Sequence, residues 1–284
     1  MFTTKQKSAM KPTLRISPTL LNEYASFING DYEKWGKTQA DFKEYVVGVR
    51  TPNVHFSRGT AVHAIMEGVE LAENGQVYEP ELDVTWQFTP DVIHSIRQYA
   101  STFDGAGHEI PLLEWIETPQ ADVAMHMRLD CLDALTLHEF KTSSKEKRYS
   151  DYYTSLQWRC YLNALSDVDV VQYHIIQLPH ADPAKVLDKV KIYSYEYRRE
   201  ADNKQRIMQY LVPLVKWVLE DADMRFRLLV DFDRMKGDMS AIVQDVIDGE
   251  MNPAEARTKL SDIAGEYEQL HPHLRKCMRE IHGA

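Results

Sequence analysis

The stretch between residues 122 and 142 constrains the fold of this chain most, because it has the sequence pattern of a β-hairpin. Its two arms, DVAMHMRLDC and TLHEFKT, are joined by a short turn. Strand side chains alternate between the faces of a sheet, so Glu139 and Lys141 point to one face and Phe140 to the other. The turn places Asp130 opposite Glu139. The sequence therefore predicts two carboxylates and an ammonium close together on one hairpin.

This combination of side chains suits metal-dependent cleavage of a phosphodiester. Two carboxylates bind a hard divalent cation, and a lysine beside them contacts the reacting phosphate. The same E-x-K spacing is also common on solvated sheet faces, where the two side chains are neighbours without a catalytic role. The order of the surrounding elements and three further motifs favour the catalytic interpretation.

Helical and strand patterns alternate along the chain around the hairpin. Helices are expected after Ser17-Pro18 and after Thr89-Pro90, because proline fits the first turn of a helix. A further helix is expected after Gly59. The expected strands lie at about 111–118, 122–131 and 136–142 and, after a helix at about 151–165, in VDVVQYHIIQL and KVKIYSYEYR. From about Glu200 the pattern is helical, and NPAEARTKLSDIAGEYEQL is expected to form the last helix.

Four short motifs follow one another in a fixed order between about residues 14 and 178. They are LRISPTLLNEYASFING (Leu14 to Gly30), Gly59-Thr60-Ala61-Val62-His63 running on to Glu67, the pair Arg128-Leu129-Asp130 and Glu139-Phe140-Lys141-Thr142, and Gln157-Trp158-Arg159-Cys160-Tyr161. As an ordered set they resemble the PD-(D/E)XK nuclease superfamily, and within it the RecB-like exonucleases, which include many phage recombination enzymes.

The resemblance implies an α/β fold with a PD-(D/E)XK (restriction-endonuclease-like) core, in which helices flank a central mixed β-sheet, and a helical C-terminal extension. We expect the core in residues 1–198 and the extension in residues 199–284. The resemblance also implies a Mg²⁺ or Mn²⁺ cofactor. The implied catalytic residues are Asp130, Glu139 and Lys141, and the implied metal ligands are His63, Asp130, Glu139 and the backbone carbonyl of Phe140. Supporting or DNA-binding roles are expected for Glu67, Gln157, Tyr161, Lys145, Lys147 and Arg148.

Two features depart from the family pattern. The family often has a glycine three residues before the aspartate, and Met127 stands there, so the strand geometry can differ. The CRISPR-associated members hold an iron–sulfur cluster with four cysteines, whereas this chain has only Cys131, Cys160 and Cys277. Counting thus excludes a four-thiolate cluster within one chain.

The helical motifs also have purely structural interpretations. His63 and Glu67 are four residues apart and share a helix face, but a lone helical histidine is more often a solvated or hydrogen-bonded residue than a ligand. Gln157 and Tyr161 are also one turn apart and are expected to reach a phosphate or to support Lys141. Alternatively, Tyr161 belongs to an apolar stripe that packs on the sheet.

The formal net charge of −10 is unfavourable for a protein that coats DNA without specificity, because neutralising phosphates requires lysine and arginine. Binding sites are local, however. The stretch KTSSKEKR, from Lys141 to Arg148, carries four cations and one anion directly after the catalytic motif. A basic active site can coexist with an acidic outer surface, although the same stretch also suits an ordinary solvated loop.

We expect a metal-dependent DNA exonuclease that hydrolyses phosphodiester bonds from duplex ends in phage or bacterial recombination. A structure- or sequence-selective endonuclease and a noncatalytic nucleic-acid- or protein-binding scaffold are the alternatives. Expected partners are linear duplex DNA, a single-strand annealing or recombination protein and further copies of the chain. No G-x-x-x-x-G-K-[ST] motif occurs, so no ATP requirement is expected. The sequence has no apolar run of bilayer length and no signal sequence. We therefore expect a cytoplasmic protein, located in the host cytoplasm if it is phage-encoded, and no membrane partner.

Overall fold

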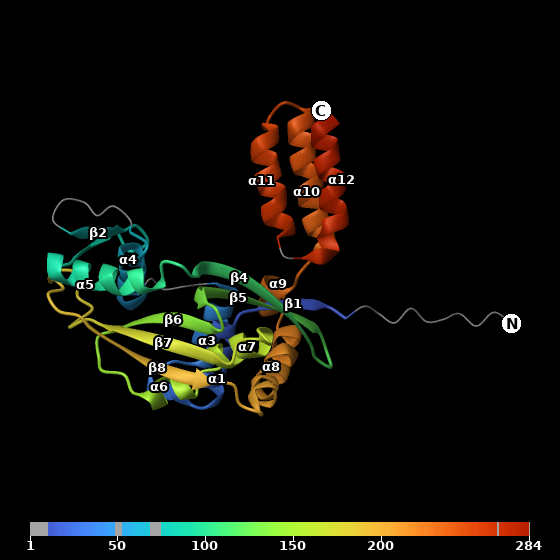
Figure 1. Ribbon diagram of the computed structural model, residues 1–284. Coiled ribbons are helices and arrows are strands. Elements are labelled where there is room, and N and C mark those ends of the chain that lie inside the picture. The colour runs from blue at the N-terminus through green and yellow to red at the C-terminus, as the bar shows by residue number, and fades with distance from the viewer. Residues whose placement is uncertain (1–10, 49–52, 69–74, 266, 284) are drawn as a thin grey trace.

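The computed structural model describes residues 11–48, 53–68, 75–265 and 267–283 (Figure 1). The strands are β1 (Thr13–Ile16), β2 (Gln76–Glu79), β3 (Val84–Gln87), β4 (Gly107–Glu117), β5 (Asp122–Asp133), β6 (Thr136–Ser143), β7 (Val170–Gln177) and β8 (Lys191–Arg198). The helices are α1 (Pro18–Ile28), α2 (Asp31–Lys34), α3 (Gln39–Val47), α4 (Val54–Met66), α5 (Pro90–Ala100), α6 (Tyr149–Tyr153), α7 (Gln157–Ala164), α8 (Asn203–Glu220), α9 (Ala222–Leu228), α10 (Phe232–Ile247), α11 (Pro253–Ala264) and α12 (His271–Gly283). The 3-10 helices are η1 (Ser101–Phe103) and η2 (Glu268–Leu270).

The central sheet is mixed, and β5 organises it. Antiparallel β4 pairs with β5 along one edge. The other edge of β5 is shared by β1, which is parallel to its first residues, and β6, which is antiparallel to its last residues. β7 is parallel to β6, and β8 is antiparallel to β7. The structure thus confirms an α/β fold with a mixed central sheet flanked by helices.

One edge of β5 is open between β1 and β6. Pairing with β1 ends at Ile16 and Met125, and pairing with β6 begins only at Cys131 and His138. Among the described strands, residues 126–129 therefore have a partner on the β4 side alone. Tyr161 of α7 reaches into this opening, where its hydroxyl donates to the carbonyl of Arg128 at 3.4 Å.

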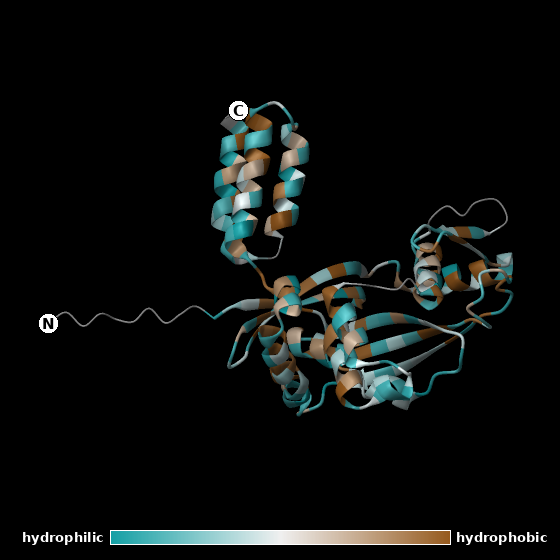
Figure 2. Cartoon of the chain, turned by 180° about the vertical axis from the view of Figure 1, so that it is seen from behind, coloured by the Kyte–Doolittle hydropathy of each residue, from teal (hydrophilic) through white to brown (hydrophobic). Residues whose placement is uncertain are grey.

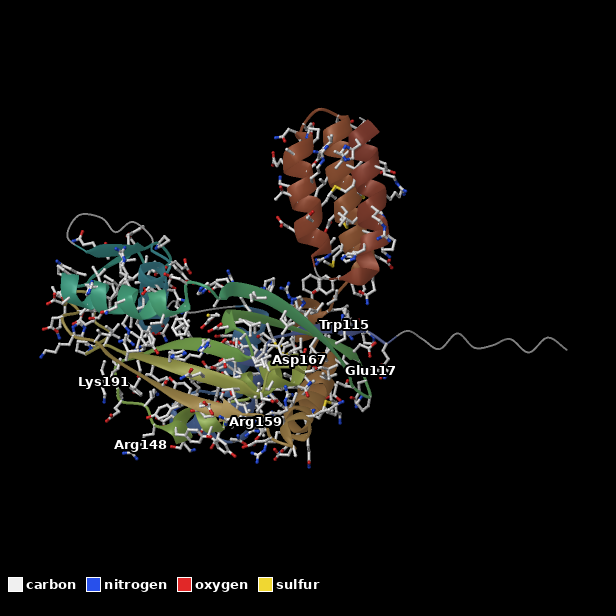
Figure 3. The ribbon with its side chains drawn as sticks, viewed as in Figure 1. Trp115, Glu117, Arg148, Arg159, Asp167 and Lys191 are labelled. Atoms are coloured by element: carbon white, nitrogen blue, oxygen red, sulfur yellow. The ribbon has the colours of Figure 1, made fainter. Side chains whose placement is uncertain are left out.

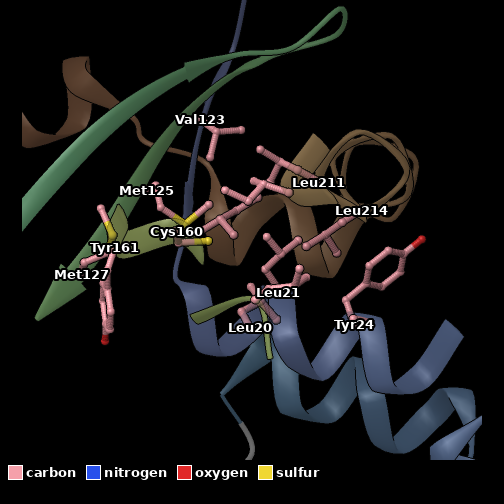
Figure 4. Close-up of a cluster of buried hydrophobic side chains, with 14 of the residues drawn as sticks. Leu20, Leu21, Tyr24, Val123, Met125, Met127, Cys160, Tyr161, Leu211 and Leu214 are labelled. Atoms are coloured by element: carbon pink, nitrogen blue, oxygen red, sulfur yellow. The ribbon is translucent and has the colours of Figure 1, made fainter. Parts of the chain in front are cut away.

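The main hydrophobic core lies between one face of the sheet and helices α1, α7, α8 and α9. Figure 4 shows its centre, where Leu21 of α1 and Leu211 of α8 approach Val123 and Met125 of β5. These side chains are fully buried. Burying an aliphatic side chain of this size stabilises a fold by about 1.5–3 kcal/mol, so this layer fixes α1 and α7 against the open edge of β5.

A buried arginine ties α7 to α8. Arg159 is 1% exposed, and its guanidinium donates to Glu200 Oε2 at 2.7 Å and to Asn203 Oδ1 at 2.6 Å. The same guanidinium lies 4.0 Å from the ring centroid of Trp158. Figure 3 labels Arg159 near the lower margin of the sheet. These contacts give the arginine of the Q-x-x-x-Y motif a structural role.

A second core covers the opposite face of the sheet with α4, α5 and the β2–β3 hairpin. It contains Val62 and Ile65 of α4, Trp86 of β3 and Phe140 of β6. Gly59 faces β6, where a Cβ atom would lie 3.4 Å from Thr142 Oγ1, an ordinary van der Waals contact. Gly59 lies within α4, which begins at Val54, and the expectation that the helix follows Gly59 is wrong.

Helices α10, α11 and α12 form a bundle with a core of its own (Figure 1). Figure 2 shows hydrophilic and hydrophobic residues interleaved along these helices. The bundle touches the sheet where Tyr267 packs edge-on against Trp115 and its hydroxyl hydrogen-bonds to His126 Nε2 at 2.9 Å. The expected division of the chain between residues 198 and 199 stays a prediction. Helices α8 and α9 contribute to the main core, and the helices that follow α9 pack into the separate cluster of the bundle.

Three further expectations about elements are wrong. The helix at 151–165 is divided into α6 and α7, because the Leu156 N–H donates to Asn22 Oδ1 on α1. Strand β4 begins at Gly107 instead of about residue 111. The last expected helix ends at Ala264, and α12 follows it. Within the described ranges no helix has the length and apolar composition to cross a membrane.

We predict that acid weakens the contact between the bundle and the sheet. Burial, with a smaller contribution from Arg15, lowers the pKa of His126 from 6.5 to about 4 in the folded chain. Protonation is therefore harder in the folded state, and the stabilisation present above pH 6.5 is lost as the pH falls toward 4. The free energy of unfolding should drop by about 1–3 kcal/mol on this account.

The measurement is urea unfolding at pH 7.5 and 5.0. His126→Gln cannot titrate and should show a smaller loss in acid, whereas His94→Gln on the exposed side of α5 should behave like the parent. An undiminished acid loss in His126→Gln would contradict this role for His126.

Candidate functional site

Asp130 lies where the β5–β6 hairpin opens. The strands pair at three positions, from Asp133 and Thr136 to Cys131 and His138. Beyond the last pair, the Phe140 N–H donates to Asp130 Oδ2 at 2.8 Å. A side-chain carboxylate thus accepts the hydrogen bond that a backbone carbonyl of the paired strand would otherwise accept. The expected pairing of Asp130 opposite Glu139 is not part of the ladder, which ends at Cys131 and His138, and Asp130 instead contacts the backbone of Phe140 within the E-x-K motif.

The alternation of side chains along β5 changes at Asp130. The odd-numbered residues from Val123 to Leu129 belong to the main core, whereas Cys131 belongs to the second core on the other face. On β4, Glu109 has φ of 50°, in the left-handed region that a side chain rarely adopts. The pairs His108–Cys131 and Ile110–Leu129 place Glu109 across from Asp130. Both strands are therefore irregular at the same level, as is common beside functional sites.

Glu139 and Lys141 form a buried ion pair on β6. Lys141 Nζ lies 2.8 Å from Glu139 Oε2, with side-chain exposures of 25% for the lysine and 1% for the glutamate. The expectation that the two side chains point together is confirmed. Their face is that of the main core, opposite to Phe140.

The helical Q-x-x-x-Y motif supports this pair through the glutamate. Gln157 Nε2 donates to Glu139 Oε2 at 3.2 Å and to the Tyr161 hydroxyl at 2.7 Å. The expected support of Lys141 is thus corrected, since Gln157 donates to Glu139, the ion-pair partner of the lysine. The structural interpretation of the motif holds as well, because Trp158 and Tyr161 are buried in the main core.

Burial dominates the electrostatics of Glu139. It raises the pKa of this carboxyl to about 7, with Lys141 lowering the pKa and Asp130 raising it. Burial lowers the pKa of Lys141, but attraction to Glu139 and Asp130 outweighs it, and the net pKa is raised. Glu139 Oε1 is buried without a hydrogen-bond partner in the described chain. A buried acceptor without a donor is costly, and a cation beside it removes that cost.

A second group of donors lies across the sheet. His63 on α4, Glu67 directly after the end of α4 and Glu109 on β4 each offer one ligand atom, and these atoms lie within 4.8 Å of one another. With Asp130 and Phe140, all three residues line a cavity of about 360 Å³. The His63 ring packs edge-on against Phe140, with centroids 6.4 Å apart. His63 and Glu67 lie close together as expected, although the helix ends at Met66 and Glu67 is its capping residue.

Asp130 stands between the two groups. It lines the cavity of His63, and its charge raises the pKa of the buried Glu139. Oxygen ligands with one imidazole fit a hard to borderline divalent cation such as Mg²⁺ or Mn²⁺. The unpartnered oxygen of Glu139 and the group around His63 each suit the implied metal. Of the four implied ligands, however, the structure brings only His63, Asp130 and Phe140 to one cavity, because Glu139 faces the main core.

A second cavity, of about 530 Å³, opens on the other side of Glu109. Arg15 and Arg128 line it together with Gln157 and Tyr161, so cationic side chains approach the residues that hold Glu139. Arg128 forms an ion pair with Glu109. The expected phosphate contacts Lys145, Lys147 and Arg148 lie elsewhere, between β6 and α6, where Lys145 and Arg148 are exposed.

No protein-family model matches this chain, and no curated protein matches it. Among solved structures, the chain is similar to one described as "Crystal structure of SSO0001", with 14% sequence identity and a TM-score of 0.31. The similarity covers 57% of this chain and 86% of the other chain. At this level the likeness carries no argument, and the candidate site stands on its geometry.

Glu109 and Arg128 are the polar residues of the site whose roles the sequence did not indicate. Glu109 precedes the expected start of β4 at about residue 111, and its place beside Asp130 depends on the register between β4 and β5. Arg128 stands in the hydrophobic-Asp motif, but only the register shows its closeness to Glu109.

We predict that His63 tunes the choice of metal. Imidazole is a softer ligand than carboxylate and suits Mn²⁺ better than Mg²⁺. His63→Ala should therefore weaken Mn²⁺ binding by at least about tenfold, since even changes to groups behind a ligand cost about 10–100-fold. Mg²⁺ binding should weaken less.

Titration calorimetry of both metals measures this difference. His55→Ala, at the exposed first turn of the same helix, is the matched control and should bind like the parent. Unchanged Mn²⁺ affinity of His63→Ala would place His63 among the structural residues.

Proposed function

We propose that this chain is a metal-dependent nuclease of the PD-(D/E)XK type, which hydrolyses DNA phosphodiester bonds from duplex ends. The observation that carries the proposal is the buried Glu139 carboxylate. One of its oxygens is held by Lys141 and Gln157, and the other is buried without a partner close to Asp130. The ordered motifs of the RecB-like exonucleases support the same assignment.

The metal ligands in this proposal are Asp130, Glu139, the Phe140 carbonyl and His63. A bound Mg²⁺ or Mn²⁺ supplies an activated water and neutralises the charge that develops on the phosphate. The Asp130 carboxylate also accepts from the Phe140 N–H, which fixes its orientation. Glu109 and Glu67 add negative charge beside His63, which strengthens cation binding.

Lys141 contacts the reacting phosphate in this proposal. Its pKa is raised, so the ammonium persists at neutral pH. This favours donation to the water or to a phosphate oxygen over removal of a proton by the lysine. Its ion pair with Glu139 fixes the position of Nζ before substrate binds.

Action on duplex ends rests on the resemblance to recombination exonucleases. An endonuclease remains the alternative within the same chemistry, and a noncatalytic scaffold is disfavoured by the intact Asp130, Glu139 and Lys141 set. The proposed partners are a recombination or annealing protein and further copies of the chain. The proposed location is the cytoplasm of a bacterium or a phage host.

We predict that Asp130→Asn, Glu139→Gln and Lys141→Met each lower cleavage by about 10²–10³-fold or more. Each variant keeps the side-chain shape and removes one charge. The double variant Glu139→Gln/Lys141→Met should be hardly slower than either single one, because groups that act as a unit give non-additive losses.

Degradation of end-labelled linear duplex in Mg²⁺ measures these losses, and thermal melting checks the fold. Glu117→Gln and Lys216→Met remove exposed charges outside the site and should leave the rate unchanged. Robust Mg²⁺-dependent cleavage by folded Lys141→Met would overturn the assignment.

We further predict dependence on a DNA end without any need for ATP. A plasmid should be degraded progressively when linearised and survive as a covalently closed circle, in Mg²⁺ without nucleotide. Cleavage should vary little with sequence and fall as salt rises, because the contacts are mainly with phosphates. Discrete fragments from the closed circle would establish the endonuclease alternative instead.

A further inference from the structure

Three tyrosines at alternate positions of β8 hold the segment that follows the E-x-K motif. The Lys147 N–H donates to the Tyr193 hydroxyl at 2.7 Å, and the Tyr195 hydroxyl donates to the Lys147 carbonyl at 2.8 Å. The Tyr197 hydroxyl donates to the carbonyl of Tyr149 at 2.8 Å. We name residues 144–148 the basic arm. Its backbone is therefore fixed against the edge strand of the sheet.

Three cations of the basic arm, Lys145, Lys147 and Arg148, form no ion pair in the part of the chain that the structure describes. Glu146, its one acidic residue, forms an ion pair with Lys191 of β8 at 2.9 Å. Lys191 and, to a lesser extent, the nearby Arg148 lower the pKa of Glu146. Figure 3 labels Arg148 and Lys191 along the lower rim of the molecule. In a chain of net charge −10, such a fixed basic segment favours an anionic partner.

Aromatic rings connect the arm to the proposed catalytic lysine. Lys141 Nζ lies 5.5 Å from the ring centroid of Tyr173, and the Tyr173 ring packs edge-on against Tyr152 at 5.3 Å. On the far side of this pair, Lys147 Nζ lies 6.0 Å from the Tyr152 centroid. Lys141 and Lys147 thus each lie over one ring of the same pair, of which Tyr173 is fully buried.

Tyr149, directly after the arm, presents an aromatic face supported from behind. It is 44% exposed, although its ring stacks on Tyr197 with centroids 4.8 Å apart and an interplanar angle of 23°, and on Tyr153 at 5.6 Å and 29°. Tyr197 in turn stacks on Trp158 at 5.5 Å. An exposed ring on a rigid stack beside cations is the arrangement with which proteins bind unpaired bases.

We infer that the basic arm and Tyr149 bind a single strand of nucleic acid next to the active site. Lys145, Lys147 and Arg148 contact its phosphates, and one base stacks on Tyr149. The inference rests on the proposed function, because it names the form in which the substrate leaves or enters the site. A single strand fits better than a duplex, since stacking on Tyr149 requires an unpaired base.

Binding of a labelled oligothymidine of about 15 nucleotides to the full chain tests the inference by fluorescence anisotropy. EDTA is present, so binding is read without cleavage. The double variant Lys147→Ala/Arg148→Ala should lower the slope of log K against log[salt] by about 1.4, since each phosphate contact on a single strand contributes about 0.7. Lys259→Ala/Lys276→Ala removes two cations from the C-terminal bundle and should change neither affinity nor slope.

Two tyrosine variants separate stacking from positioning. Tyr149→Leu should weaken binding by at least about fivefold and Tyr149→Phe should not, because phenylalanine keeps the stacking face. Tyr195→Phe removes the hydroxyl that holds Lys147 and keeps every cation, so it should weaken binding at an unchanged salt slope. Thermal melting confirms that each variant is folded.

The inference is overturned if the arm variant retains the parent's slope, if Tyr149→Leu binds like the parent, or if polyglutamate of equal charge binds as tightly as the oligonucleotide. Failure is distinguishable from failure of the nuclease proposal. If the parent cleaves linear duplex but its arm variants bind the oligonucleotide normally, only the inference about the basic arm is refuted. If binding depends on the arm but the chain never cleaves, only the nuclease proposal is refuted.

Discussion

The buried ion pair between Glu139 and Lys141 is the interaction on which the rest of the candidate site depends. Removing a carboxylate and an ammonium from water is costly, and a buried pair often stabilises a fold no better than apolar side chains would. The glutamate is 1% exposed within the sheet, and one of its oxygens has no partner in the described chain. The burial of Glu139 is therefore better explained by a role in binding than by a contribution to the stability of the fold.

The irregular part of β5 lies beside this pair. Regular pairing with both neighbours would enclose Asp130 in the ladder. Instead, β1 and β6 leave part of one edge of β5 open, and the Asp130 carboxylate closes the hairpin through the Phe140 N–H. The change of faces at Asp130 places it beside the cavity of His63 while its charge still acts on Glu139. One strand defect thus couples donors from both sides of the sheet.

Local patterns predicted the parts of the structure that depend on neighbouring residues. Period-two alternation correctly paired Glu139 with Lys141, and helical spacing correctly grouped His63 with Glu67. The α/β class with a mixed sheet, which the structure confirms, was expected from the resemblance of the ordered motifs and not from any single pattern. The short strand β1 escaped prediction, since four residues carry too little periodicity to identify.

Features that depend on distant contacts could not be predicted in this way. The break between α6 and α7 depends on Asn22, which is 134 residues from Leu156 in the sequence. Glu109 joins the site only through the register of β4 with β5. The sequence YSYEYR shows the alternate tyrosines of β8, but it does not show which loop their hydroxyls contact. Nuclease activity, the metal and the partners stay predictions, because they depend on what binds the chain.

The location of a bound metal tests the central claim most directly. Anomalous scattering from a crystal of the full chain grown with Mn²⁺ identifies that position without reference to activity. The account predicts a peak within coordination distance of Asp130 and Glu139 Oε1, at about 2–2.5 Å. A fully occupied peak confined to His63, Glu67 and Glu109, or ordered density without any peak beside Glu139, would contradict it.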